Sequence, residues 1–173
     1  GCMDKAGVDY WSNHWSNLTS FYVFRERGHH EKLFISLYDD FFSLDSGGIV
    51  EIGAAGSTYI PFFKERYGRT IRGIDYSEAG CILTNKLYGD MGVDSQVTCR
   101  DLFCTTKFEE FQFVYSIGVF EHFDDIEGTC RAAKRYLLDG GYVLTIIPNM
   151  AGFIGFIQKL FSRKIFLAHV PYS

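Results

Sequence analysis

The stretch Ile49–Phe63, IVEIGAAGSTYIPFF, reads as a strand, a glycine turn and the start of a helix. Its first four residues, IVEI, are typical of a short strand buried in a sheet. Gly53 and Gly56 follow directly, where a side chain would block the approach of a ligand to the backbone. A helix that begins after them would offer that ligand free N–H groups and the positive end of its dipole. The stretch is therefore typical of a nucleotide-binding loop.

The spacing within this loop argues against a dinucleotide. Counted from Gly53, the pattern G-x-G-x-x-G would need glycine where the chain has Ala55 and Thr58. The loop carries Glu51 at the carboxyl end of its strand, and a carboxylate there suits a cationic or hydroxyl-rich ligand better than a pyrophosphate. The alternative for Glu51 is a strand-end acid that accepts hydrogen bonds from neighbouring backbone N–H groups.

Outward from the loop, short β-rich runs alternate with helical segments. This alternation predicts an α/β fold, a Rossmann-like doubly wound and mostly parallel sheet with helices on both faces. Ser77 is expected to cap a helix, and Asp139–Gly141 is expected to form the turn after one. The expected strands are Ile49–Ile52, Thr70–Ile74, Ser95–Cys99, Phe111–Ser116 and Tyr142–Ile147; the expected helices are Asn17–Arg27, Glu31–Phe42, Ser57–Tyr67, Ser77–Tyr88 and Asp125–Leu138.

Length and composition set the broad class. The 173 residues suit a single domain, with 47% hydrophobic and 22% charged residues, as in ordinary globular proteins. The net charge of −4 offers no basic face for nucleic acid. The five cysteines form no C-x-x-C pair, which disfavours a disulfide framework or a structural zinc site and indicates a reducing, cytoplasmic location. No apolar run is long enough to span a bilayer.

Two more acids stand at the ends of later strands. Asp75 follows the apolar run IRGI, 24 positions after Glu51, where a carboxylate can accept both hydroxyls of a ribose. Asp101 follows the third expected strand, in VTCRDLF. Acids at three successive strand ends, together with a glycine loop, are far more specific than any one of them.

These motifs resemble class I S-adenosylmethionine (SAM)-dependent methyltransferases, in particular the small-molecule branch that includes the ubiquinone-biosynthesis O-methyltransferases. VEIGAAGS is similar to the first motif of that family, IRGIDYSE to the second, CRDLF to the third, FQFVYSIGVFEHFDD to the fourth and LLDGGYVLTIIPN to the fifth. The resemblance runs from about Ile49 to Asn149. It departs from the family at Ala55 and Ser57, which replace glycines of the usual loop.

The resemblance implies that the chain binds SAM and releases S-adenosylhomocysteine (SAH). Carried over position by position, Gly53 and the neighbouring backbone would face the methionine end, with Glu51 ordering the loop. Asp75 would hold the ribose hydroxyls, and Asp101 the adenine amino group. The cofactor-binding residues implied in this way are Glu51, Gly53, Ala54, Gly56, Asp75, Tyr76, Asp101, Leu102, Ser116 and Ile117.

Methyl transfer to a hydroxyl or an acidic carbon also needs a base, and His122 is the expected one. A histidine side chain changes charge near neutral pH, and this position faces the acceptor in related enzymes. The alternative is a structural histidine that caps the next helix. In the ubiquinone-pathway relatives an E-x-x-E-H run can bind a divalent cation, but Gly118 replaces its first acid, so no metal is expected.

The two ends of the chain are expected to contribute to the acceptor side. Residues 1–46 would form an N-terminal helical cover, residues 47–149 the SAM-binding core, and residues 150–173 an apolar helix and tail that begin an acceptor region. The expected substrate-binding residues are Tyr10 and Trp11, whose alternative is ordinary docking of a terminal helix, and Pro148 and Asn149.

The chain ends before the last two strands that complete the sheet in this family, so a truncated acceptor half is expected. A sheet edge left open invites pairing, and a homodimer through that edge is one expected partner. The expected function is transfer of a methyl group to a small-molecule acceptor, with O-methylation favoured over N- or C-methylation. The alternatives are a non-catalytic SAM-binding domain or scaffold and an NAD-dependent oxidoreductase, the latter disfavoured by Ala55 and Thr58.

Overall fold

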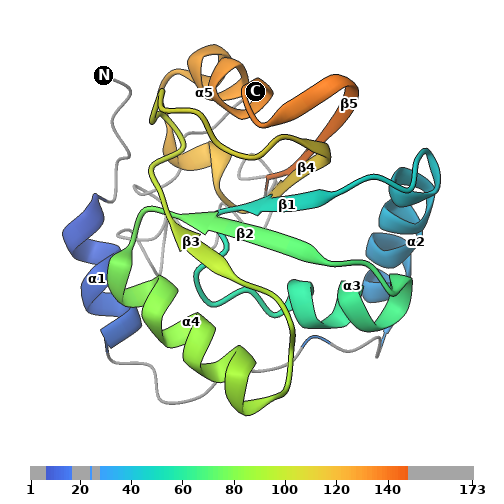
Figure 1. Cartoon of the computed structure of the whole chain (residues 1–173), viewed down its shortest axis with the longest axis horizontal. Coiled ribbons are helices and arrows are strands. Elements are labelled where there is room, and N and C mark those ends of the chain that lie inside the picture. The colour runs from blue at the N-terminus through green and yellow to red at the C-terminus, as the bar shows by residue number, and fades with distance from the viewer. Residues whose placement is uncertain (1–6, 17–23, 25–27, 148–173) are drawn as a thin grey trace.

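The computed structural model of the chain describes residues 7–16, 24 and 28–147 (Figure 1). Its centre is a five-stranded sheet in which every neighbouring pair of strands is parallel. The strand order is β3-β2-β1-β4-β5, so the order reverses between β1 and β4. The strands are β1 (Ile49–Ile52), β2 (Ile71–Asp75), β3 (Val97–Cys99), β4 (Phe111–Ile117) and β5 (Leu137–Ile146).

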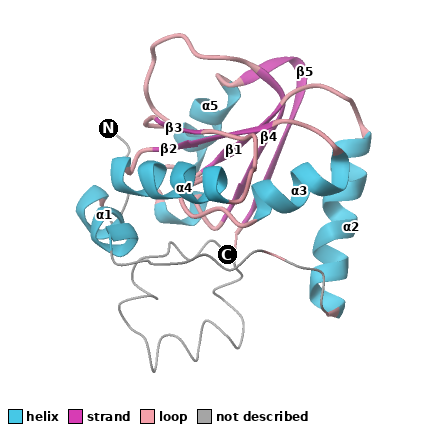
Figure 2. Ribbon diagram, turned by 60° about the horizontal axis from the view of Figure 1, so that its bottom comes forward, coloured by secondary structure: helices cyan, strands magenta, loops and turns pink. Residues whose placement is uncertain are grey.

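Helices lie on both faces of this sheet, which confirms the predicted fold class (Figures 1 and 2). Ser77 caps α4 as expected, since its hydroxyl accepts a hydrogen bond from the Gly80 N–H. The predicted helix over 17–27 falls almost entirely outside the described residues. The helices are α1 (Val8–Ser16), α2 (His29–Ser43), α3 (Tyr59–Tyr67), α4 (Glu78–Asp90), the short 3₁₀ helix η1 (Phe120–His122) and α5 (Ile126–Lys134).

The strands bury side chains on both faces, because successive residues of a strand point to opposite sides. On β1, Ile49 packs into an aromatic core with α2, α3 and α4. Val50 and Ile52 pack into a second core with α5. Glu51 points to the same side as Ile49, so its carboxylate lies within the aromatic core rather than in solvent.

The boundary between α5 and β5 corrects the prediction. The helix ends at Lys134 instead of Leu138, and β5 begins at Leu137. The carbonyl of Tyr136 accepts a hydrogen bond from the Phe111 N–H at 2.8 Å, and the Tyr136 side chain is buried, so the chain joins the sheet early. Asp139–Gly141 therefore lies inside β5, as an irregularity in its pairing with β4, and the predicted turn between helix and strand is wrong.

Candidate functional site

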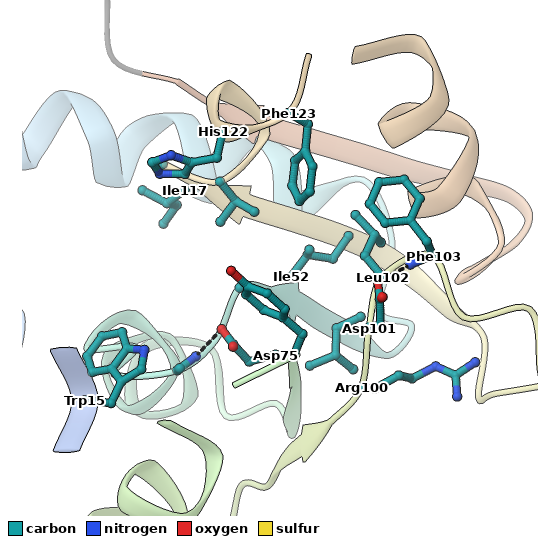
Figure 3. Close-up of a pocket in the computed structure, with 16 residues that line it drawn as sticks. Trp15, Ile52, Asp75, Arg100, Asp101, Leu102, Phe103, Ile117, His122 and Phe123 are labelled. Atoms are coloured by element: carbon teal, nitrogen blue, oxygen red, sulfur yellow. Dashed lines mark hydrogen bonds between the residues drawn. The ribbon is translucent and has the colours of Figure 1, made fainter. Parts of the chain in front are cut away.

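A cavity of about 320 Å³ opens at the carboxyl ends of β1, β2 and β4, beside the point where the strand order reverses (Figure 3). Ligands of open parallel sheets bind at such points. Its volume lies at the lower end of the range of about 300–1,000 Å³ found for small-molecule sites. The cavity is lined by Trp15, Ile52, Gly53, Ala55, Ile74, Asp75, Tyr76, Arg100, Asp101, Leu102, Phe103, Ile117, Gly118, Val119, His122 and Phe123.

The glycine loop after β1 bends toward β2. The N–H groups of Gly53 and Ala54 both donate to the carbonyl of Ile74, at 2.9 and 3.1 Å. Gly53 has a φ of +75°, and a Cβ there would lie 2.3 Å from a methyl group of Val119. Glycine is thus required at this position both by the backbone angle and by the close approach of the β4 loop.

The carboxylate of Asp75 joins the glycine loop to the start of α4. One of its oxygens, Oδ2, accepts a hydrogen bond from the Ala55 N–H at 3.0 Å, and Oδ1 accepts one from the Ser77 N–H at 2.8 Å. The residue is only 9% exposed yet lines the cavity (Figure 3). The two backbone bonds fix the direction of the carboxylate, and a carboxylate accepts about four hydrogen bonds in all.

Glu51 lies beneath the loop and does not line the cavity. Its Oε2 accepts hydrogen bonds from the hydroxyls of Ser57 at 2.7 Å and Tyr115 at 2.6 Å. Burial among aromatic side chains raises the pKa of the Glu51 carboxyl to about 7, against the opposing effect of these two hydrogen bonds. Glu51 is therefore hydrogen-bonded to the loop from below, through Ser57.

A loop after β3 forms one wall of the cavity. Asp101 accepts a hydrogen bond from the Phe103 N–H at 2.8 Å, which turns the chain so that Leu102 is buried against the second core. Arg100 holds this loop from outside, since its guanidinium donates to the hydroxyl of Tyr136 at 2.9 Å and to that of Thr106 at 3.1 Å.

The loop after β4 forms the facing wall. Ile117, Gly118 and Val119 lead into η1, which brings His122 to the cavity at 7% exposure. The ring of the following residue, Phe123, meets that of Phe103 edge to face, with centroids 5.3 Å apart (Figure 3). The two walls thus enclose a largely apolar cavity. Its two carboxylates, Asp75 and Asp101, lie near the ends of β2 and β3.

Several lining residues were not predicted, and Trp15 is the one that comes from a separate part of the chain. The others lie within a few residues of predicted ones: Ile52, Ala55, Ile74, Arg100, Phe103, Gly118, Val119 and Phe123. Helix α1 lies beside α4 (Figures 1 and 2), and the Trp15 ring fits against Gly56 and Gly80. A Cβ on either glycine would come within 2.3 and 2.8 Å of that ring. The expected substrate residue Tyr10 is 53% exposed and does not line the cavity. The side chain of Trp11, in the same helix, and residues Pro148 and Asn149 fall outside the described part of the structure.

The remaining predicted residues divide into two groups. Asp75, Tyr76, Asp101, Leu102, Gly53, Ile117 and His122 meet at the cavity although they come from four separate segments. Ala54 is fully buried below the loop, and the Gly56 N–H donates to Thr84. The Ser116 hydroxyl pairs with that of Thr145 at 2.8 Å. These three residues support the cavity walls without lining them.

Within residues 7–16 and 28–147, no group of three histidine, cysteine or acidic side chains is arranged to hold a metal ion. In the same part of the chain, no helix has the length and apolar character needed to cross a bilayer.

Comparison with known families gives one match. The family described as "Methyltransferase domain" matches residues 50–145, more than half of the chain. The matched segment contains β2, β3 and β4, all but one residue each of β1 and β5, and with them most of the cavity. No curated protein gives a significant match to the sequence.

Solved structures with the same fold include a protein from Pyrococcus horikoshii OT3, with a TM-score of 0.62 and 15% identity over 85% of this chain and 71% of that one. The plantazolicin methyltransferase in complex with SAH has a TM-score of 0.60 and 17% identity over 78% and 52%. Coclaurine N-methyltransferase, bound to N-methylheliamine and SAH, has a TM-score of 0.53 and 14% identity over 72% and 38%. The chain thus spans well under half the length of coclaurine N-methyltransferase, and at these identities the likeness concerns the fold.

Proposed function

Because the chain belongs to the methyltransferase-domain family, we propose that it binds SAM in the cavity and transfers the methyl group to a small-molecule acceptor. One observation carries the proposal. Two carboxylates, Asp75 and Asp101, stand at or just after the ends of β2 and β3 in a largely apolar cavity, next to a glycine loop. A ligand with a diol, a flat base and a cationic end matches this distribution of groups.

The residues of the cavity fit the adenosine half of SAM. Asp75 is oriented by two backbone N–H groups and would accept hydrogen bonds from the ribose hydroxyls. Asp101 would accept from the exocyclic amine of adenine, whose ring would lie against Leu102 and the facing apolar wall. The methionine half would lie along Gly53, Ala55 and the facing Gly118, which line the same cavity.

When bound, SAM supplies a methyl group on a sulfonium centre, which an acceptor atom displaces in line. The protein would then act mainly by position and by exclusion of water. Trp15 and Phe123 would limit the access of water to the cavity from two sides (Figure 3). His122, buried at the cavity wall, would take the proton from a hydroxyl acceptor, which favours O-methylation.

Known neighbours agree with a small acceptor. Coclaurine N-methyltransferase was solved with N-methylheliamine as well as SAH, and the plantazolicin methyltransferase with SAH. The cavity walls present Phe103, Phe123 and Ile117, so an acceptor that enters here would be largely apolar. The net charge of −4 further disfavours nucleic acid as the acceptor.

Calorimetry with SAH tests the cofactor. The unmodified chain should bind SAH and should not bind NAD. Asp75→Asn should weaken SAH binding by about 10- to 100-fold, the effect of losing hydrogen bonds to a charged group. Asp94→Asn is the matched control, because the Asp94 side chain is 97% exposed on the surface. Equal affinity in the two variants would refute the ribose assignment, and no SAH binding by the unmodified chain would refute the function.

The role of His122 needs a separate measurement on the full-length protein. With radiolabelled SAM and a metabolite extract, His122→Ala should lower transfer by about 10²- to 10⁴-fold, the usual contribution of a general base. Its affinity for SAH should stay near that of the unmodified protein. Unchanged transfer would show that His122 serves only the structure of η1.

A further inference from the structure

Two thiols converge behind the turn that carries Asp75 and Tyr76. Cys81 lies in the first turns of α4, where its N–H donates to the Ser77 carbonyl at 2.9 Å. Cys99 is the last residue of β3 and pairs with Asp75 across the two parallel strands. One thiol therefore approaches the turn from the helix and the other from the neighbouring strand.

The hydrogen bonds of the two thiols bring both of them to the same turn. The Cys81 Sγ donates to the Asp75 carbonyl at 3.5 Å, and the Cys99 Sγ donates to the next carbonyl, that of Tyr76, at 3.8 Å. The two accepting carbonyls belong to consecutive residues, so both thiols lie against the same short turn. Disulfide bonds form only between cysteines whose side chains lie close together, and two thiols on consecutive carbonyls of one turn are suited to that approach.

The two thiols differ in their access to solvent. Cys81 is 2% exposed, whereas Cys99 is exposed at the surface. Burial raises the pKa of the Cys81 thiol to about 12, with smaller contributions from the charge of Asp75 and from Cys99. Cys99 is therefore the thiol that an external reagent meets first, and Cys81 is the one that can reach it from inside.

We propose that Cys81 and Cys99 are a redox-modifiable dithiol that closes to a disulfide in the presence of a small disulfide such as oxidised glutathione. The Cys99 thiolate attacks one glutathione sulfur, and the first glutathione leaves as a thiol. Cys81 then loses its proton and attacks the Cys99 sulfur, which releases the second glutathione. The two protein thiols lose two electrons and two protons, and one glutathione disulfide is reduced to two thiols.

Closure would act on the cavity through the turn. The new bond removes both S–H groups that now donate to the carbonyls of Asp75 and Tyr76, and it ties α4 to the end of β3. The Asp75 carboxylate also accepts from the loop at Ala55, so a shift of the turn moves both partners. We expect roughly a tenfold loss of SAH affinity, since displacement of a positioned group by a fraction of an ångström has effects of this order. This part rests on the proposed function, whereas the disulfide itself does not.

Peptide mapping by mass spectrometry tests the bond. The chain is incubated with oxidised glutathione until its mass stops changing, and the remaining free thiols are capped with N-ethylmaleimide. The peptides that contain Cys81 and Cys99 should appear joined, with the loss of two hydrogen atoms, and should separate on reduction. Cys99→Ser should abolish the joined species, and Cys130→Ser, which alters an exposed cysteine of α5, should leave it intact.

Calorimetry on the same samples tests the coupling. The oxidised chain should bind SAH about tenfold more weakly than the reduced chain, and dithiothreitol should restore the affinity. Oxidised Cys99→Ser should bind like the reduced chain. Two mapping results would overturn the proposal: glutathione that stays on Cys99 without a disulfide to Cys81, or a disulfide between other cysteines. A Cys81–Cys99 disulfide with unchanged SAH affinity would also overturn it. Failure of the reduced chain to bind SAH would count against the proposed function, and the mapping result would stand on its own.

Discussion

Replacement of Glu51 by glutamine should make the chain more stable at neutral pH, and the gain should depend on pH. The Glu51 side chain is 3% exposed and its Oε2 accepts two hydroxyl hydrogen bonds. Glutamine has nearly the same shape and keeps one oxygen that can accept both bonds. It carries no charge at any pH, so the substitution removes the titration of this site with little change in packing.

The sign follows from the raised pKa of Glu51, about 7 in the folded protein against 4.5 for an ordinary glutamate. Below pH 4.5 the carboxyl is protonated in both the folded and the unfolded chain, so its titration has no effect on stability. Between pH 4.5 and 7 the unfolded chain releases the proton while the folded chain keeps it, so the folded state loses stability as the pH rises. At about 1.4 kcal/mol per pH unit, the full loss above pH 7 is on the order of 3 kcal/mol.

Urea unfolding at a series of pH values measures this effect. The free energy of unfolding of Glu51→Gln, minus that of the unmodified chain, should rise by up to ~3 kcal/mol from pH 4.5 to 8 and level off above pH 7. Glu109→Gln is the matched control, because the Glu109 side chain is 64% exposed, and its difference should stay flat. A Glu51→Gln difference that is constant or falls with pH would refute the assignment of a raised pKa to this carboxyl.

Two further predictions concern the loop and the aromatic core. Gly53→Ala and Gly68→Ala each place a side chain on a left-handed backbone and should each destabilise the chain by ~1–2 kcal/mol in thermal unfolding. Only Gly53→Ala should also abolish SAH binding in calorimetry, because its new methyl group meets Val119. A methyl group at Gly68 has nothing within 4 Å, so equal SAH binding by the two variants would contradict this explanation. Tyr38→Phe should leave the melting temperature unchanged or raise it, since the buried Tyr38 hydroxyl has no hydrogen-bond partner among the described residues; destabilisation above about 1 kcal/mol would indicate a partner for that hydroxyl.

The sequence predicted the sheet well because local patterns determine most of it. β1 has the predicted bounds, and the other strands are shifted by a few residues. The error at Asp139–Gly141 has a physical origin. Glycine after a helical pattern usually marks the end of the helix, but here the buried Tyr136 and its bond to Phe111 draw the chain into the sheet before the glycines.

The site was predictable where strand ends determine it and less so elsewhere. Asp75 and Asp101 could be placed because the carboxyl ends of parallel strands meet on one side of a sheet. The entry of Trp15 into the cavity depends on contact between α1 and α4, more than 60 residues apart in the chain. Nothing in the local pattern distinguishes Trp15 from Trp11. The small residues at Gly56 and Gly80 that accommodate its ring were the available signal, and it can be interpreted only in three dimensions.

The structure also gives a reason for one of the two departures expected in the glycine loop. Ser57 is the departure with a structural role, because its hydroxyl donates to Glu51 while it accepts from the N–H groups of Tyr59 and Ile60, both at 3.3 Å. A glycine could make none of these bonds, so the buried carboxylate and the first N–H groups of α3 would lose partners. Ala55, the other departure, donates its backbone N–H to Asp75, a bond that glycine would make equally well. The loop is thus held from below by the buried carboxylate of Glu51 and from the side by that of Asp75. Because both acids belong to strands, the sheet itself, and not the glycines alone, determines the conformation of the loop.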